Sequence, residues 1–240
     1  MRRVRLRTGP AALGGAMFAA ALFLFLPLRL ALGWFGADDA GLTARTADGS
    51  VWAGSLTDAH LGQLALGDLK AHLSPWPLLI GRARIELDGH EDAVRPFHGA
   101  VTVSRHRTGI DDATASLATG NLFAPLPVTR FDLDAVSAHF VDGACHDAEG
   151  RVSVSLTTAA AGIALPATLT GTARCDGEAL LLPLTSSAGT ESVTLRVMAA
   201  GTYAATFLVR PTDPEAAQKL ELAGFAPTSA GHRLSIEGRF

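Results

Sequence analysis

The residues of this chain best suited to chemistry are two histidines and two cysteines in its second half. They are His139, Cys145, His146 and Cys175. These ligand types suit zinc, but their spacing matches none of the common two-by-two zinc arrangements. The favoured interpretation is one disulfide between the two cysteines, with the histidines as bystanders. Zinc ligation and two buried free thiols stay open as alternatives.

Carboxylate pairs form a second group of candidates. Asp132 and Asp134 lie two apart in one predicted strand, so their side chains share a face. Such a pair could act in acid–base catalysis or bind calcium, but a solvated polar face is the favoured interpretation. Asp111 and Asp112 are predicted to begin a turn.

No motif of the common enzyme classes accompanies these residues. The serines occur without a Gly-x-Ser-x-Gly turn, and neither a phosphate-binding loop nor a dinucleotide fingerprint is present. Three tryptophans, Trp34, Trp52 and Trp76, are too few for a stacking platform and are expected to pack or to anchor the chain. We therefore expect no catalytic residue, no cofactor and no metal, in a protein that is not an enzyme.

The elements expected to carry these residues are β-strands. Apolar and polar residues alternate over 84–88, 151–156, 167–175 and 233–237. This alternation predicts half-buried antiparallel strands. Glycine-containing pairs that favour hairpin turns occur at 48–49, 88–89, 142–143, 149–150 and 176–177. Many short strands with regular turns predict a mainly β fold, a large antiparallel domain that curls or closes like a barrel.

Two short helices are expected to interrupt the strands. The segment 75–80, which contains two prolines, should make one turn and end at Gly81. Asp213 followed by Pro214 is a typical helix start, and this helix should stop near Gly224. The favoured seam between an N-terminal and a C-terminal half of the domain is the stretch Pro125-Leu126-Pro127, near residue 125.

The N-terminal segment determines where the rest of the chain is located. Four arginines in the first seven residues precede 20 uncharged residues, Gly9 to Leu28. As a helix this run would span ~30 Å, about the hydrocarbon thickness of a bilayer. Because positive flanks stay inside, we expect a cytoplasmic tail at 1–8, a transmembrane anchor at 9–34 and a periplasmic β domain at 35–240. The alternative is a signal peptide cleaved near Gly33.

The charges divide unevenly between these parts. Five of the 20 basic residues lie at or before Arg29 and all 23 acidic residues follow it, which leaves the expected periplasmic part with a net charge of −8. Such a domain is not expected to bind nucleic acid and shows no polybasic stretch for lipid headgroups. In an oxidising compartment, a Cys145–Cys175 disulfide should stabilise the domain by about 3–4 kcal/mol.

Four stretches together carry a resemblance to a known family. They are the basic tail with its apolar segment, the sequence DGSVWAG at 48–54, the unit from Leu66 to Gly81 with its Pro-Trp-Pro-Leu-Leu core, and the ending from Leu222 to Gly238. In these stretches, and in the placement of its cysteines, the chain resembles the type II secretion system protein N family, also called general secretion pathway protein N.

The resemblance implies a function in protein transport. It implies a single-pass accessory component of the bacterial inner membrane, whose periplasmic domain contacts other parts of the type II secretion machine. The outer-membrane secretin and the bitopic inner-membrane clamp protein are the expected partners. The alternative is a resemblance to AsmA-like envelope proteins, which are linked to lipid handling. In that case the apolar face of the sheet would form a groove for acyl chains.

Overall fold

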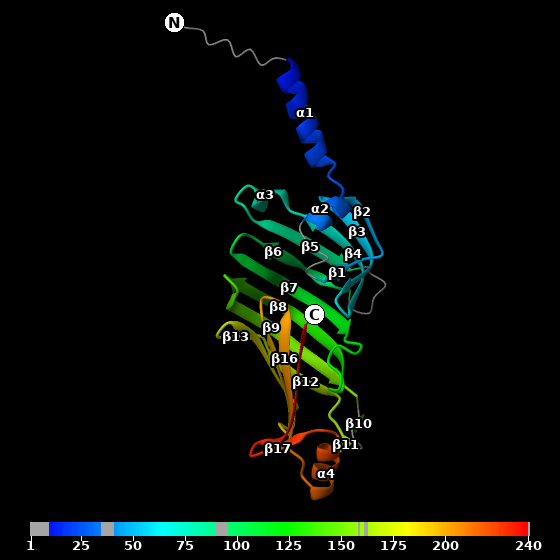
Figure 1. Cartoon of the computed structure of the whole chain (residues 1–240), viewed down its shortest axis with the longest axis vertical. Coiled ribbons are helices and arrows are strands. Elements are labelled where there is room, and N and C mark those ends of the chain that lie inside the picture. The colour runs from blue at the N-terminus through cyan, green and yellow to red at the C-terminus, as the bar shows by residue number, and fades with distance from the viewer. Residues whose placement is uncertain (1–9, 35–40, 90–95, 158, 161–162, 240) are drawn as a thin grey trace.

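A computed structural model describes residues 10–34, 41–89, 96–157, 159–160 and 163–239 (Figure 1). The helices are α1 (Pro10–Leu24), α2 (Leu28–Trp34), α3 (Pro75–Leu78) and α4 (Pro214–Leu222). The strands of the first half are β1 (Leu42–Thr43), β2 (Thr46–Ser50), β3 (Ala53–Leu61), β4 (Leu64–Leu73), β5 (Ala83–Gly89), β6 (His98–Val103) and β7 (Arg107–Ala118). Those of the second half are β8 (Val128–Val141), β9 (Ala144–Leu156), β10 (Ala159–Ala160), β11 (Ile163–Ala164), β12 (Thr168–Thr172), β13 (Arg174–Asp176), β14 (Ala179–Thr185), β15 (Glu191–Val197), β16 (Thr202–Val209), β17 (Ala226–Thr228) and β18 (Gly231–Arg239).

In the described part of the chain, one antiparallel sheet of 16 strands makes up most of the domain, and its strands follow one another almost in chain order from β1 to β18. Strands β10 and β11 pair separately as a two-stranded sheet. The sheet is open, with β1 and β2 paired to β3 at one end and β17 paired to β18 at the other. A mainly β, antiparallel, curled fold is therefore confirmed, and closure into a barrel is not what the described strands form. In Figure 1 the sheet descends from α1, with α2 and α3 near its upper end and α4 at its lower end.

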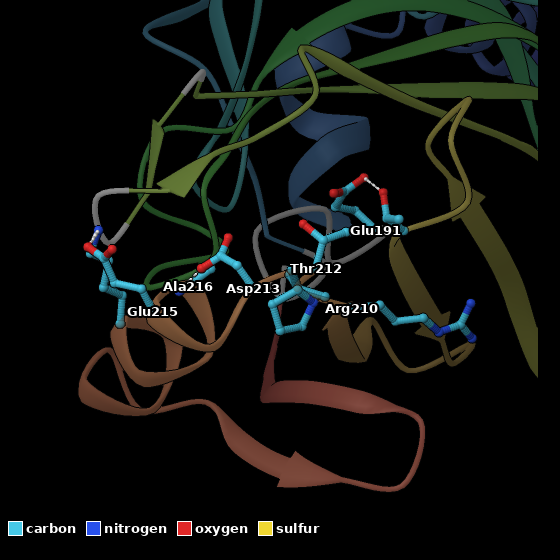
Figure 2. Close-up of a pocket in the computed structure, with 10 residues that line it drawn as sticks. Glu191, Arg210, Thr212, Asp213, Glu215 and Ala216 are labelled. Atoms are coloured by element: carbon cyan, nitrogen blue, oxygen red, sulfur yellow. Dashed lines mark hydrogen bonds and ion pairs between the residues drawn. The ribbon is translucent and has the colours of Figure 1, made fainter.

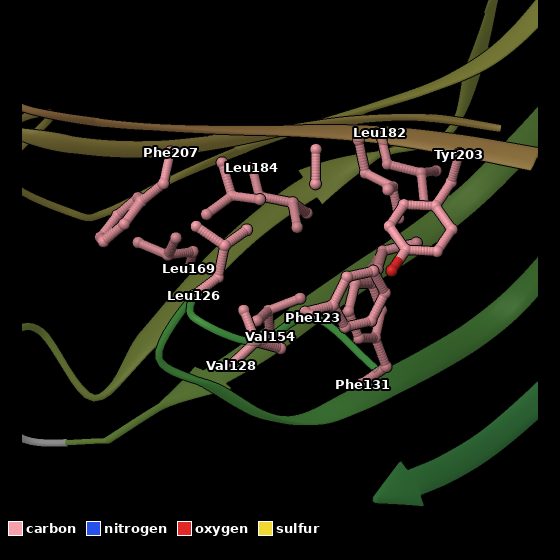
Figure 3. Close-up of a cluster of buried hydrophobic side chains, with 14 of the residues drawn as sticks. Phe123, Leu126, Val128, Phe131, Val154, Leu169, Leu182, Leu184, Tyr203 and Phe207 are labelled. Atoms are coloured by element: carbon pink, nitrogen blue, oxygen red, sulfur yellow. The ribbon is translucent and has the colours of Figure 1, made fainter. Parts of the chain in front are cut away.

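The main core lies in the second half of the sheet, where the strands curl so that their apolar sides face one another. Figure 3 shows Leu182, Leu184 and Phe207 from β14 and β16 opposite Val154 and Leu169 from β9 and β12. Leu184 and Leu169 are fully buried and Phe207 is 1% exposed. The alternation that predicted these strands is thus confirmed, since their apolar residues line this interior.

The segment between β7 and β8 fills this core rather than separating two halves. Phe123 is buried, with its ring 5.3 Å from that of Phe131 and 5.1 Å from that of Tyr203. The Tyr203 hydroxyl donates a hydrogen bond to the backbone oxygen of Leu122, and burial raises the pKa of this hydroxyl. Leu126, from the same segment, is also buried in this core (Figure 3). The sheet runs without interruption past the position where a seam was expected.

The predicted turns have mixed outcomes. Asp142 and Gly143 have φ values of +50° and +85° and connect β8 to β9, as expected for a hairpin turn with two positive φ angles. The 176–177 pair also lies at a hairpin, between β13 and β14. The pair at 149–150 does not. Gly150 (φ +107°) lies inside β9 at a bulge opposite Ala135, where a Cβ would meet the Ala135 oxygen at 2.4 Å.

Two other turn predictions fall on strand ends. Gly49 pairs with Gly54 inside the β2–β3 ladder, and the chain reverses after it at Val51 and Trp52, so the turn predicted at 48–49 is wrong by three residues. The pair at 88–89 ends β5, and the residues that follow it lie outside the described part of the chain.

Both predicted short helices are confirmed. The α3 turn follows Ser74 and ends before Gly81, which has a φ of +73°. At α4 the Asp213 carboxylate accepts a hydrogen bond of 2.7 Å from the backbone N–H of Ala216, so it caps the helix as the sequence predicts. Gly224, with a φ of +90°, follows the end of this helix.

The N-terminal apolar segment is not the single helix over 9–34 that the sequence suggests. Its helix α1 ends at Leu24, and a second helix, α2, begins at Leu28. Pro27 explains the break because it lacks an N–H and its ring clashes with the preceding helical turn. Within the described residues, none of the helices has both the length and the apolarity needed to cross a bilayer.

The residues at the break between α1 and α2 attach the N-terminal segment to the sheet. Pro27 bridges to Ser50, and the backbone N–H of Val51 donates to the oxygen of Leu26 at 3.0 Å. Leu28 is buried in a second, smaller core with Leu56, Ala59 and Leu69. The α2 helix therefore packs on the sheet, whereas α1 extends away from it (Figure 1).

Candidate functional site

The two cysteines are joined in a disulfide, the pairing that the sequence predicts. Cys145 lies in β9 and Cys175 in β13, with their Cα atoms 5.5 Å apart. The backbone N–H of Cys145 also donates to the oxygen of Glu178 at 3.0 Å, so backbone and side chains tie the same two segments. Because zinc binds the thiolate form, bonded cysteines are not available as ligands. Among the described residues, no group of three or more suitable side chains could hold a metal ion.

His139, a bystander in the sequence interpretation, lies at the centre of a polar cluster on the face of the sheet opposite to Ile85, Val101 and Ile110. Strand register places Arg84, Thr102, Gly109, His139 and Asp147 in one line across β5, β6, β7, β8 and β9. A Cβ at Gly109 would lie 2.4 Å from the His139 ring, so only glycine leaves room for the ring there. We call this set, with Asp111 and Arg107, the His139 cluster.

Both ring nitrogens of His139 contact carboxylates. Nε2 lies 2.8 Å from Asp111 and Nδ1 lies 2.6 Å from Asp147. An ionised carboxylate can only accept, so both contacts are hydrogen bonds only in the imidazolium form of the ring. The His139 side chain is 14% exposed and that of Asp111 is 19% exposed, which shields the contact between them from water.

Asp111 is the less exposed of the two carboxylates that contact His139, at 19% against 48% for Asp147. Burial alone would raise its pKa, but hydrogen bonds from Thr102 (2.7 Å) and His139 and the charge of Arg84 (2.7 Å) outweigh burial, so the pKa is lowered. The sequence predicted a turn at this point, which is wrong. Asp111 and Asp112 lie within β7 at a bulge, where the Asp112 N–H donates to the Ser137 hydroxyl at 3.0 Å.

Asp147, the other carboxylate of the cluster, contacts His146 and Arg107 as well as His139. The hydrogen bond from His146 (2.8 Å), followed by that from His139, lowers the pKa of its carboxyl, and Arg107 donates to it at 3.2 Å. Of the histidines and cysteines that the sequence grouped, the structure thus brings His139 and His146 to one carboxylate and keeps the cysteines apart as a disulfide.

The His139 cluster lines a hollow of about 510 Å³ beneath α3. Trp76, Ile80 and Arg82 cover one side of it, and Arg84 and Arg107 line it with His139. Of the hydroxyls among the described residues that line this hollow, that of Thr102 donates to Asp111 and that of Ser104 donates to the backbone oxygen of Arg107, so neither is bonded to the histidine. The hollow's excess of arginines suits the binding of an anionic group better than proton transfer.

Replacing Asp111 by asparagine should lower the free energy of unfolding by about 1–3 kcal/mol at pH 7, because Arg84 and His139 would lose a shielded anionic partner. The pKa of Asp111 is lowered on folding, so its contribution is present above the unfolded-state pKa and is lost as pH falls through the folded-state value. Below about pH 4 the D111N variant should therefore lose less stability than wild type. Denaturant titrations between neutral and acidic pH measure both effects.

The matched control is D142N. Asp142 also pairs with a histidine, His106, at 2.8 Å, but its side chain is 70% exposed and asparagine suits its turn. This variant should stay within about 0.5 kcal/mol of wild type. Equal losses in D111N and D142N would show that the His139 cluster adds nothing beyond an exposed ion pair.

The carboxylate pair Asp132 and Asp134 borders a different hollow. Both residues lie on the same side of β8 as His139. Asp132 accepts from Ser116 at 2.6 Å, and Asp134 lies 3.7 Å from Arg151. Each carboxylate therefore has its own polar partner, which fits the solvated face that the sequence favours.

Another open hollow, of about 520 Å³, lies at the N-terminal end of α4 (Figure 2). Its charged groups are used within the protein. Asp213 caps the helix, Glu215 pairs with Lys219 and raises the pKa of that lysine, and Arg210 donates to the backbone oxygen of Ala230. These contacts within the protein account for the charged side chains that line the hollow.

An exposed apolar surface on α3 is the feature that sequence reasoning did not single out. Trp76 and Leu79 are each 79% exposed, and Ile80 is also exposed. The sequence signal was present, since prolines on both sides of Trp76 restrict the turn and hold large apolar side chains outside the strand pattern. The partners of the His139 cluster left no such signal, because only strand register assembles them.

These observations define a class of protein: a curled, mainly β domain that follows an apolar N-terminal helix and carries an exposed apolar surface on α3. A comparison with family models matches residues 40–235 to the type II secretion system (T2SS) protein N family, and the chain belongs to that family. It is therefore an accessory component of type II secretion. No curated protein and no solved structure matched the chain in the corresponding searches.

Proposed function

We propose that this protein is held in the bacterial inner membrane by its N-terminal segment and presents its β domain to other secretion components in the periplasm, without catalytic activity. Family membership carries the secretion role. The membrane anchor, the periplasmic location and the contacts with the outer-membrane secretin and the bitopic clamp protein are the parts that need experiments.

The surface of α1 supports the anchor. The helix contains no charged residue, and its described side chains are exposed, among them Leu13, Met17, Phe18 and Leu24. Phe25 continues this exposed apolar surface. A helix that is apolar all around is expected to be buried in protein or in lipid. Because α1 points away from the domain (Figure 1), lipid is the fitting surroundings.

The charge pattern and the disulfide support the orientation. Arginines crowd the first seven residues and acidic residues are confined to the part after Arg29. Positive flanks remain in the cytoplasm, which puts the β domain on the other side. There the oxidising periplasm allows the Cys145–Cys175 bond to persist.

The last strand offers a route for partner contact. One edge of β18 pairs with β16 along its length, but β17 covers the other edge only over Gly231–Arg233. Within the described chain, residues 234–239 therefore present unpaired backbone groups, with Leu234 and Ile236 half-buried. An exposed edge of this kind accepts a strand from another protein unless something covers it.

Cross-linking tests this route in cells. A photoreactive amino acid at Ser235, exposed on β18, should trap a secretion component, whereas the same probe at Thr170 should not, because Thr170 has paired strands on both sides. Recovery of no secretion component from either position or from tagged whole protein would count against the proposed function. Resistance of the protein to carbonate extraction tests the anchor separately.

Lipid handling is the second candidate function, and one row of residues favours it. Leu73, Ile85, Val101 and Ile110 are cross-strand neighbours on the apolar face of β4–β7, and each is only half-buried. This face continues into the main core through Ile110. The main core itself is filled by protein side chains (Figure 3), so acyl chains would have to lie on this open row.

A photoreactive probe at Val101 distinguishes the two functions. Lipid handling predicts a phospholipid adduct at Val101 and none at Thr102, its neighbour on the opposite face, in the hollow of the His139 cluster. Absence of lipid at Val101 would remove this second candidate and leave the secretion proposal untouched.

A further inference from the structure

We propose that the α3 surface, made of Trp76, Leu79, Ile80 and Arg82, is a second membrane contact that lies in the outer headgroup layer of the inner membrane. The inference rests on the proposed anchor. In addition to the anchor, the β domain itself then contacts the bilayer.

The first observation is that backbone hydrogen bonds link α3 to the end of the anchor segment. The oxygen of Leu26 accepts from the N–H of Val51 at 3.0 Å, and the oxygen of Val51 accepts from the N–H of Leu73 at 3.1 Å. Pro75, the first residue of α3, follows Leu73 by two positions. The start of α3 therefore lies two hydrogen bonds away from the point where the chain leaves α1, and Figure 1 shows both at the same end of the domain.

The second observation is the composition of the surface. Trp76, Leu79 and Ile80 are more exposed than side chains of this size usually are in a soluble domain. A tryptophan beside aliphatic residues is typical of the membrane interface, where the indole ring lies at headgroup level. The turn is short and carries no polar side chain from Pro75 to Ile80 that would need water.

The third observation is the local charge. No acidic residue occurs between Asp68 and Glu86, although the part of the chain after Arg29 has a net charge of −8. Arg82, Arg84 and Arg107 line the hollow beneath α3. Arg84 and Arg107 already pair with carboxylates of the His139 cluster, so Arg82 is the cation best placed for an anionic headgroup.

A bilayer explains these three observations together better than a protein partner does. A partner protein would need neither the closeness to the anchor nor the basic rim in an acidic domain. With α1 in the hydrocarbon, the fixed junction at Pro27 sets α3 close to the headgroups. This placement has no further ordering cost, because α2 and β4 are already packed together.

Photocross-linking of the full-length chain in native membrane vesicles tests the proposal. A p-benzoylphenylalanine probe at Leu79 should form an adduct with the mass of a phospholipid. The matched control is the same probe at Leu222, which is 89% exposed on α4 at the opposite end of the domain (Figure 1) and should give no lipid adduct. R82Q should reduce the share of anionic lipid in the Leu79 adduct.

The outcomes separate the α3 contact from the anchor. A protein adduct in place of lipid at Leu79, equal lipid labelling at Leu79 and Leu222, or no lipid adduct at Leu79 would overturn the proposal. Carbonate extraction of the same vesicles reports on the anchor. If the chain stays in the membrane while Leu79 fails to label lipid, only the α3 contact is lost, whereas release of the chain removes both.

Discussion

Replacing Phe207 by alanine should lower the free energy of unfolding by about 3–5 kcal/mol, a large share of the total stability of an ordinary domain. Phe207 is 1% exposed on β16, and its ring packs edge-on against Phe225 at 5.9 Å. The surrounding strands are paired on both sides and cannot collapse into the space that the ring leaves. Chemical denaturation followed by circular dichroism measures the loss.

The control for this prediction is L222A. Leu222 is 89% exposed on α4, so alanine there removes little buried surface and should change stability by less than about 0.5 kcal/mol. A similar shift in the two variants would mean that the curled second half of the sheet does not determine the stability of the domain.

Local signals predicted most of the fold. Alternation at Val152 and Val154 places both in the core at 0% exposure, and the Asp142–Gly143 pair forms the turn that its chemistry favours. The capped start of α4 at Asp213 also depends only on neighbouring residues. In each case the physical cause lies within a few positions of the chain, where a sequence can show it.

Features that depend on a partner strand were not predictable in the same way. Gly150 looks like a turn residue in the sequence, but it lies in a bulge that needs Ala135 on the next strand. Asp111 and Asp147 contact His139, and Arg84 contacts Asp111, only because four ladders hold one register. Of the candidate site, the sequence therefore yielded the disulfide, whereas it treated His139 as a bystander and did not show the cluster around it.

The N-terminal segment shows the same limit and its consequence for function. Composition identified an apolar run and Pro27 within it, but the sequence did not show that Pro27 and Leu28 contact the sheet. The residues after the break are packed on the sheet, and α3 lies at the same end of the domain as α1 (Figure 1). Under the proposed anchoring, this end of the domain, with α3, is the one nearest the bilayer.

Removing the disulfide with the double substitution C145A/C175A should lower the free energy of unfolding by about 3–4 kcal/mol, because the bond closes a loop with a sequence separation of 30 and restricts the unfolded chain. The bond ties β9 to β13, next to the main core, so its loss should also increase hydrogen exchange in both strands. Denaturation with and without reductant provides the control: reduced wild type should match the double variant, and the variant should not respond to reductant. Equal stability of oxidised and reduced wild type would show that the bond does not contribute to folding.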